Sequence, residues 1–131
     1  MLVYLVRHAH SDPGEPDELR PLSERGRDEA RTLAERLAES PNPPRLVLTS
    51  PLLRAKETAS EIADATAAAL RVDARLSPGA TAEALREAVL DERAPVAAVC
   101  HQPDCSQIAI ALTGQDPGFP PAGVAEIELS S

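Results

Sequence analysis

Short apolar runs alternate along the chain with longer segments whose apolar residues recur every three or four positions. The runs are rich in β-branched residues and predict buried strands, whereas the three- and four-residue spacing predicts amphipathic helices. The last run differs because apolar residues alternate with acidic ones, which is typical of an edge strand. Strands are predicted at 2–6, 46–48, 71–76, 96–100 and 124–129.

Capping residues and prolines set the expected starts of the helices. Ser23 is a suitable N-cap for a helix that ends before Pro41. Ser50 followed by Pro51 predicts an N-cap and a first helical residue, with the helix running to about Leu70. Two more helices are expected, one after Thr81 and one with Pro103 as its first residue.

Strands that alternate with helices imply βαβ units and parallel pairing. The predicted fold class is therefore α/β, a three-layer α/β/α sandwich around a mainly parallel sheet with an edge strand at the C-terminus. A length of 131 residues fits one domain, 1–131.

Composition narrows the range of partners. The chain has 13 Lys and Arg against 21 Asp and Glu, a formal net charge of −8, which argues against nucleic acid and against an anionic membrane surface. No apolar run reaches membrane-spanning length. Cys100 and Cys105 form no secreted disulfide pattern, so a cytoplasmic location is expected. Lys56 is the one lysine; the remaining cations are arginines, whose planar fork suits phosphate.

Polar side chains follow three of the predicted strands directly. Arg7 and His8 follow the first strand, Ser50 and Arg54 the second, and His101 the run at 96–100. Ligands of open α/β sheets bind outside the carboxyl ends of the strands, and helix N-termini there favour anions. Each residue alone is more often a solvated or structural group, but their agreement on one sheet edge predicts a phosphoryl-binding site.

The same residues carry a resemblance to a known family. Arg7-His8-Ala9, the segment 21–26 (PLSERG), the stretch 50–58 (SPLLRAKET) and His101-Gln102-Pro103 resemble, in order, motifs of the histidine phosphatase (phosphoglycerate-mutase-like) superfamily. The short chain is most similar to its compact SixA-like phosphohistidine phosphatase branch. The resemblance implies a phosphatase that acts on protein phosphohistidine or on a small phosphorylated compound.

The resemblance also implies roles for individual residues. His8 would attack phosphorus through a neutral imidazole, while Arg7, Arg54 and a protonated His101 would bind the phosphoryl oxygens. Ser11 and Ser50 would add hydroxyl contacts. No metal or other cofactor is expected, because arginines would supply the positive charge.

A general acid is not evident in the sequence. Larger relatives carry a glutamate in the loop after the third strand; here Glu83 is displaced from that position, and its favoured interpretation is a solvent-facing residue in a first helical turn. His10 is a second candidate to protonate a leaving group, although a surface-loop histidine is the commoner case. A missing acid suits a good leaving group such as imidazole.

Alternative functions remain open at this point. One is a phosphatase of sugar, nucleotide or polyphosphate esters. Another is a catalytically silent module that binds phosphate or a phosphoprotein. A third is a metal site built on Cys100, His101 and Cys105 with the two N-terminal histidines, His8 and His10. The spacing matches no zinc pattern, and a small apolar Cys100 in a strand is the commoner case.

Overall fold

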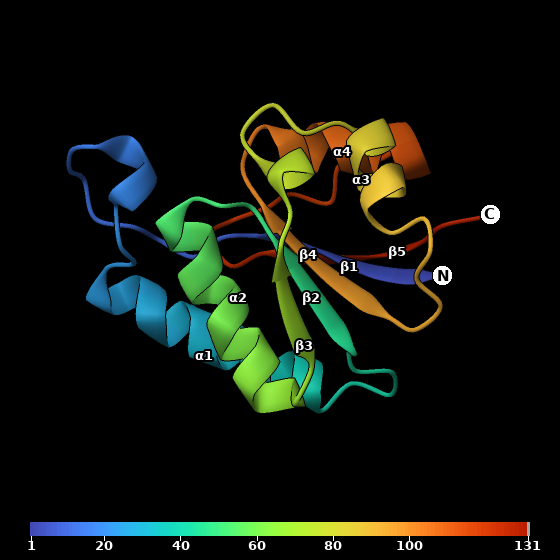
Figure 1. Cartoon of the computed structure of the whole chain (residues 1–131), viewed down its shortest axis with the longest axis horizontal. Coiled ribbons are helices and arrows are strands. Elements are labelled where there is room, and N and C mark those ends of the chain that lie inside the picture. Colours follow the sequence, from blue (N-terminus) through green and yellow to red (C-terminus); the bar gives the residue numbers. More distant parts are fainter. Residues whose placement is uncertain (131) are drawn as a thin grey trace.

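A computed structural model describes residues 1–130 of the chain (Figure 1). Its elements in chain order are β1 (Leu2–Arg7), the 3₁₀ turn η1 (Asp17–Leu19), α1 (Glu24–Ala38), β2 (Leu46–Thr49), α2 (Leu53–Thr66), β3 (Ala69–Val72), η2 (Ala74–Leu76), α3 (Ala82–Ala88), β4 (Val96–Cys100), α4 (Asp104–Thr113) and β5 (Val124–Glu128).

The five strands form one sheet in the order β3-β2-β4-β1-β5. All neighbours are parallel except β1 and β5, which pair antiparallel at one edge. The predicted α/β class, the mainly parallel sheet and the C-terminal edge strand are thus confirmed.

Helices cover both faces of the sheet. Figure 1 shows α1 and α2 on one side of the strands and α3 and α4 on the other. Successive residues of β1 point to opposite faces: Tyr4 and Val6 pack in the cluster with α1 and α2, whereas Val3 and Leu5 pack in the cluster with α3 and α4. The central strands β2 and β4 are buried along their whole length because helices lie on both sides.

Four predicted boundaries are wrong, among them the end of α2, which lies at Thr66 rather than near Leu70. The third strand lies at Ala69–Val72 rather than 71–76, since α2 ends at Thr66 and Ala67 adopts a left-handed conformation with φ 57°. The helix α2 begins at Leu53, two residues after Pro51, and Ser50 is not its N-cap. Pro103 precedes the first residue of α4 instead of being that residue.

Other helix starts agree with the sequence. The Oγ of Ser23 accepts a hydrogen bond from the Gly26 N–H at 3.0 Å, and the Oγ1 of Thr81 accepts one from the Ala84 N–H at 3.1 Å. Both residues are therefore N-caps, as predicted. Within residues 1–130, no helix is both long enough and apolar enough to cross a membrane.

Candidate active site

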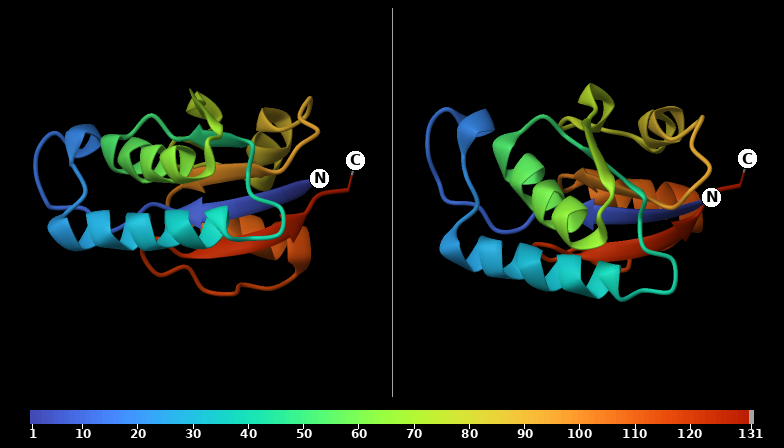
Figure 2. Two further views of the ribbon diagram at one scale, coloured as in Figure 1. Left: turned by 90° about the horizontal axis from the view of Figure 1, so that it is seen from below. Right: turned by 60° about the horizontal axis from the view of Figure 1, so that its bottom comes forward.

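The carboxyl ends of the three innermost parallel strands meet at one edge of the sheet. Arg7, the last residue of β1, is the register partner of Cys100 in β4, and Thr49 of β2 is the partner of Val99. The loop of residues 10–20 lies at this end, and the start of β1 lies at the other end (Figure 2). The edge thus gathers the residues that follow each strand.

A cavity of about 390 Å³ opens at this edge. It is lined by Arg7, His8, Ala9, His10, Ser11, Asp17, Arg20, Arg54, Pro78, His101, Gln102 and Pro121. The structure therefore brings together the two arginines and the two histidines that the sequence analysis expected to share a site.

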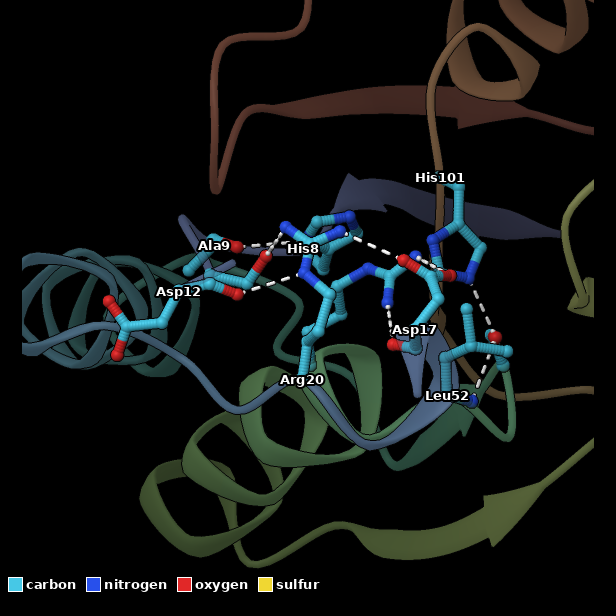
Figure 3. Close-up of polar contacts among 10 residues, drawn as sticks. His8, Ala9, Asp12, Asp17, Arg20, Leu52 and His101 are labelled. Carbon is cyan, nitrogen blue, oxygen red and sulfur yellow. Dashed lines mark hydrogen bonds and ion pairs between the residues drawn. The ribbon is translucent and has the colours of Figure 1, made fainter. Parts of the chain in front are cut away.

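His8 is held as one tautomer. Its Nδ1 lies 2.7 Å from the backbone oxygen of Ala9, which can only accept, so Nδ1 carries the proton and Nε2 keeps its lone pair (Figure 3). Burial lowers the pKa of His8 to about 4 against the opposing effect of the Ala9 hydrogen bond, and the positive charges of Arg54, Arg7 and Arg20 lower it further. At neutral pH the imidazole is therefore uncharged and its Nε2 has a free lone pair.

His101 lies beside His8, with ring centroids 5.1 Å apart. Its Nε2 lies 2.7 Å from the Oγ of Ser50, while its buried Nδ1 has no partner within residues 1–130. Burial lowers the pKa of His101 to about 4, and the nearby His8 and Arg54 lower it further. A bound anion would raise this pKa, so the protonated His101 expected from the sequence stays a prediction for the site with phosphate bound.

Arg7 and Arg54 are anchored by backbone oxygens. Arg7 donates from Nη1 to the Phe119 oxygen at 2.9 Å, and its buried Nε has no partner within the described residues. Arg54 is 7% exposed and donates from Nη1 to the Asp17 oxygen at 2.8 Å. The terminal nitrogens that these backbone contacts do not use belong to two side chains that line the cavity.

Arg20 and Asp17 belong to the same site, although sequence reasoning did not single them out. Arg20 donates to the Asp12 oxygen at 2.8 Å, to the Ser11 Oγ at 2.9 Å and to the Asp17 Oδ1 at 2.9 Å. Asp17 also accepts from the Nη2 of Arg54 at 3.2 Å. The available signal was the position of both residues in the polar segment between His10 and Pro21, which the strand pattern places at the correct edge.

Thr58 links the segment that carries His8 to the helix that carries Arg54. Its fully buried Oγ1 accepts from the Ala9 N–H at 3.0 Å and donates to the Arg54 oxygen at 2.9 Å. The threonine that closes the stretch 50–58 thus fixes the distance between the first strand and α2.

The two predicted serines have different surroundings. Ser11 lines the cavity and accepts from Arg20. Ser50 is fully buried and is not part of the cavity lining. Its hydroxyl contacts His101 instead, so a direct contact between Ser50 and phosphate is not supported, and the group orients the histidine.

The two candidate acids also separate. Glu83 is exposed in the first turn of α3 and does not line the cavity, so the structure contradicts its role as an acid at this site. His10 does line the cavity, and its Nδ1 lies 2.7 Å from the Oγ of Ser23.

The cysteines lie behind the site. Cys100 and Cys105 are buried free thiols with Sγ atoms 3.7 Å apart. Hydrogen bonding between them and burial raise the pKa of the Cys105 thiol. Within residues 1–130, no cluster of three or more His, Cys, Asp or Glu side chains is arranged to hold a metal ion.

Fold and site together define an α/β protein with a cavity lined by arginines and histidines at the carboxyl ends of its inner strands. The sequence profile described as histidine phosphatase superfamily (branch 1) matches residues 3–78. The chain belongs to this superfamily, and the predictions of the family and of a phosphatase are confirmed. No protein of curated function matches the chain.

Solved structures agree with this assignment. The protein histidine phosphatase SixA in complex with tungstate is 27% identical with a TM-score of 0.87, over 98% of this chain and 88% of that one. A SixA phosphohistidine phosphatase from Agrobacterium tumefaciens is 29% identical with a TM-score of 0.83, over 95% and 89%. A mycobacterial glucosyl-3-phosphoglycerate phosphatase bound to VO3 is 22% identical with a TM-score of 0.73, over 95% and 90%, and shows the fold alone. The SixA-like branch predicted from the sequence is confirmed.

Proposed function

We propose that the protein hydrolyses the phosphoryl group of phosphohistidine in proteins, or of a small phosphorylated compound, through a phosphohistidine intermediate on His8. The tautomer of His8 supports this most directly, because it leaves the Nε2 lone pair free. His8 lines the cavity together with three arginines. A neutral imidazole with one nitrogen bound and the other free meets the requirements of a nucleophile.

The reaction has two displacements. In the first, the His8 Nε2 lone pair forms a bond to phosphorus while the bond from phosphorus to the leaving group breaks, and the leaving group takes a proton from solvent. In the second, water attacks the phosphorus of the intermediate, its proton passes to solvent or product, and Nε2 regains its lone pair as inorganic phosphate departs. Arg7, Arg54 and Arg20 would bind the phosphoryl oxygens in both transition states, where charge stabilisation is the main contribution to catalysis.

His101 would take part when the phosphoryl group is present. A dianion in the cavity that His101 lines would raise the pKa of the ring, so the protonated ring would help to balance the charge of the ligand. Ser50 keeps the ring in place through Nε2. Ser11 would contribute a hydroxyl next to Arg20.

The leaving group separates the candidate substrates. Asp17 is the one carboxylate that lines the cavity, and hydrogen bonds from Arg20 and Arg54 lower its pKa, so it is not a proton donor at neutral pH. An alkyl ester needs such a donor, whereas the imidazole of phosphohistidine departs readily. This favours phosphohistidine over sugar or nucleotide esters. The free thiols of Cys100 and Cys105 fit the cytoplasmic location that we also propose.

Turnover with three phosphorylated compounds tests the proposal. We expect a phosphohistidine peptide and an aryl phosphate to be hydrolysed in the presence of EDTA, an alkyl phosphate to react at least about 100-fold more slowly, and His8→Ala to abolish all turnover. Acid-labile, base-stable labelling of the wild-type chain, absent from His8→Ala, would identify the intermediate. Activity that EDTA removes and zinc restores would contradict the mechanism.

Two further variants check the candidate acids. Glu83→Gln is the matched control, because its exposed side chain lies off the cavity, and it should retain full activity. His10→Gln should reduce alkyl phosphate turnover more than aryl phosphate turnover if His10 donates the proton. An equal effect on both substrates would exclude that role.

A further inference from the structure

Asp17 places a carboxylate where the cavity would otherwise present free guanidinium groups. Its Oδ1 accepts from the Nη1 of Arg20 at 2.9 Å and its Oδ2 from the Nη2 of Arg54 at 3.2 Å (Figure 3). One carboxylate thus bridges two arginines through its two oxygens. Two oxygens of a phosphoryl group would make the same kind of bridge, because both anions match the guanidinium fork.

Both arginines have anchors that do not involve this carboxylate. Arg54 is anchored through Nη1 by the backbone oxygen of Asp17, an interaction that does not involve the side chain. Arg20 is anchored through Nε by the oxygen of Asp12 and through Nη2 by the Oγ of Ser11. The carboxylate therefore accepts from the Nη1 of Arg20 and the Nη2 of Arg54. The other anchors of the two arginines use neither of these nitrogens.

The Asp17 side chain is not held in place by burial. It is 60% exposed, and the short turn η1 that carries it buries none of its three residues. Ion pairs at such exposure contribute little to stability, so an anion of higher charge can replace the carboxylate at small cost. Hydrogen bonds from Arg20 and Arg54 lower the pKa of Asp17, so the side chain is charged at neutral pH.

We propose that Asp17 is a specificity-determining residue, a carboxylate that the ligand must displace from Arg20 and Arg54 and that admits phosphoryl dianions in preference to monoanions. A dianion gains more than the carboxylate from the arginines, since it carries twice the charge and can also contact Arg7. A phosphodiester carries the same single charge as the carboxylate and has no such advantage. The inference rests on the proposed function, because it takes the cavity to be the phosphoryl site.

Two variants of the same turn provide the test. Asp17→Asn removes the charge but keeps the size of the side chain. Glu18→Gln removes one charge from the next residue, which is exposed and whose side chain makes no hydrogen bond or ion pair to the rest of residues 1–130. Both variants therefore change the net charge by the same amount. They differ in whether the altered side chain contacts the arginines.

Isothermal titration at pH 8 with orthophosphate and with dimethyl phosphate would measure the effect. We expect Asp17→Asn to bind orthophosphate about three- to tenfold more tightly than wild type and to gain a larger factor for dimethyl phosphate, so that the preference for the dianion narrows. An equal gain for both anions would contradict the role of Asp17 in selectivity. Glu18→Gln should change either affinity by less than about twofold.

The outcomes separate the two proposals. Orthophosphate binding that is unchanged or weaker in Asp17→Asn would overturn the inference, since the carboxylate would then be indifferent or needed to orient the arginines. An equal gain in Glu18→Gln would also overturn it, because net charge alone would explain the result. A wild-type chain that neither binds orthophosphate nor hydrolyses the phosphohistidine peptide would instead contradict the proposed function.

Discussion

Gly26 packs against the loop that leaves the first strand, and its replacement by alanine tests how closely α1 must approach that loop. A Cβ built on Gly26 lies 1.9 Å from the backbone oxygen of His10 and 2.9 Å from its carbonyl carbon, whereas ordinary contacts start at 3.4 Å. Both obstacles are backbone atoms, which no side-chain rotation can move. The loop and the helix must therefore separate by more than 1 Å.

Two opposing effects decide the sign of the change in stability. Alanine in the interior of a helix is favoured over glycine by about 1 kcal/mol. Against this, an extra methyl group in a packed site costs about 1–3 kcal/mol. The shift also weakens the hydrogen bond from the Ser23 N–H to the His10 oxygen, now 3.0 Å long, at about 1 kcal/mol. We expect Gly26→Ala to lower the free energy of unfolding by about 2 kcal/mol in total.

Urea unfolding followed by circular dichroism measures this change. Thr32→Ala on the exposed face of α1 is the control, and it should be neutral or stabilising by up to about 0.5 kcal/mol through helix propensity alone. If Gly26→Ala proved as stable as wild type, the close contact between α1 and the His10 carbonyl would be refuted. Turnover should fall as well, because the displaced segment adjoins His8.

Three further outcomes are expected. Thr58→Val leaves the buried Ala9 N–H without an acceptor and should lower the free energy of unfolding by about 1–3 kcal/mol, as urea titration would measure. Asp104→Ala removes the carboxylate that accepts from two backbone N–H groups of the loop at 79–80, so thermal unfolding should occur several degrees lower, whereas Asp104→Asn should retain most of the stability. The pKa values of His8 and His101, lowered from 6.5 to about 4, mean that the unfolded chain binds more protons between these limits. Stability should therefore fall as pH drops from 6.5 to 4, by about 3 kcal/mol from His8, and His8→Gln should lose that part.

The sheet could be predicted because its central strands are apolar throughout. Residues 46–48 and 96–100 carry no polar face, which requires cover on both sides and hence two layers of helices. The alternation in 124–129 identified the edge strand for the opposite reason, since one of its faces meets solvent. These patterns depend only on burial, which local sequence reports well.

The end of α2 could not be predicted from local preference. Residues 65–70 are mostly alanine, which favours continuation of the helix. The chain instead turns at Ala67 and pairs Ala69 with Leu46 in the parallel register of β2. Every residue of β3 is exposed, so no hydrophobic pattern marks the strand. Pairing with the backbone of β2 decides where α2 ends, and the residues next to Ala67 give no indication of that pairing.

In the candidate site, too, some residues could be predicted from the sequence and others could not. Residues that directly follow strands could be assigned to one edge because parallel register aligns the strand ends, as the pairing of Arg7 with Cys100 shows. Ser50 was wrongly expected to face the ligand, since strand order does not say whether a side chain turns into the cavity or behind its neighbour. That choice depends on the 2.7 Å contact with His101, which lies 51 residues away in the chain.

Net charge proved a poor guide to the ligand for a related reason. The chain carries eight more acidic than basic residues, yet three arginines share one cavity and meet one acid, Asp17, there. Segment 12–18 holds four acidic residues, and only one of them forms ion pairs with these arginines. A count of charges cannot distinguish that residue from the other three. The position of Asp17 follows from where Arg20 and Arg54 are anchored. Whether an acidic protein can bind an anion therefore depends on where individual charged side chains are anchored rather than on the net charge.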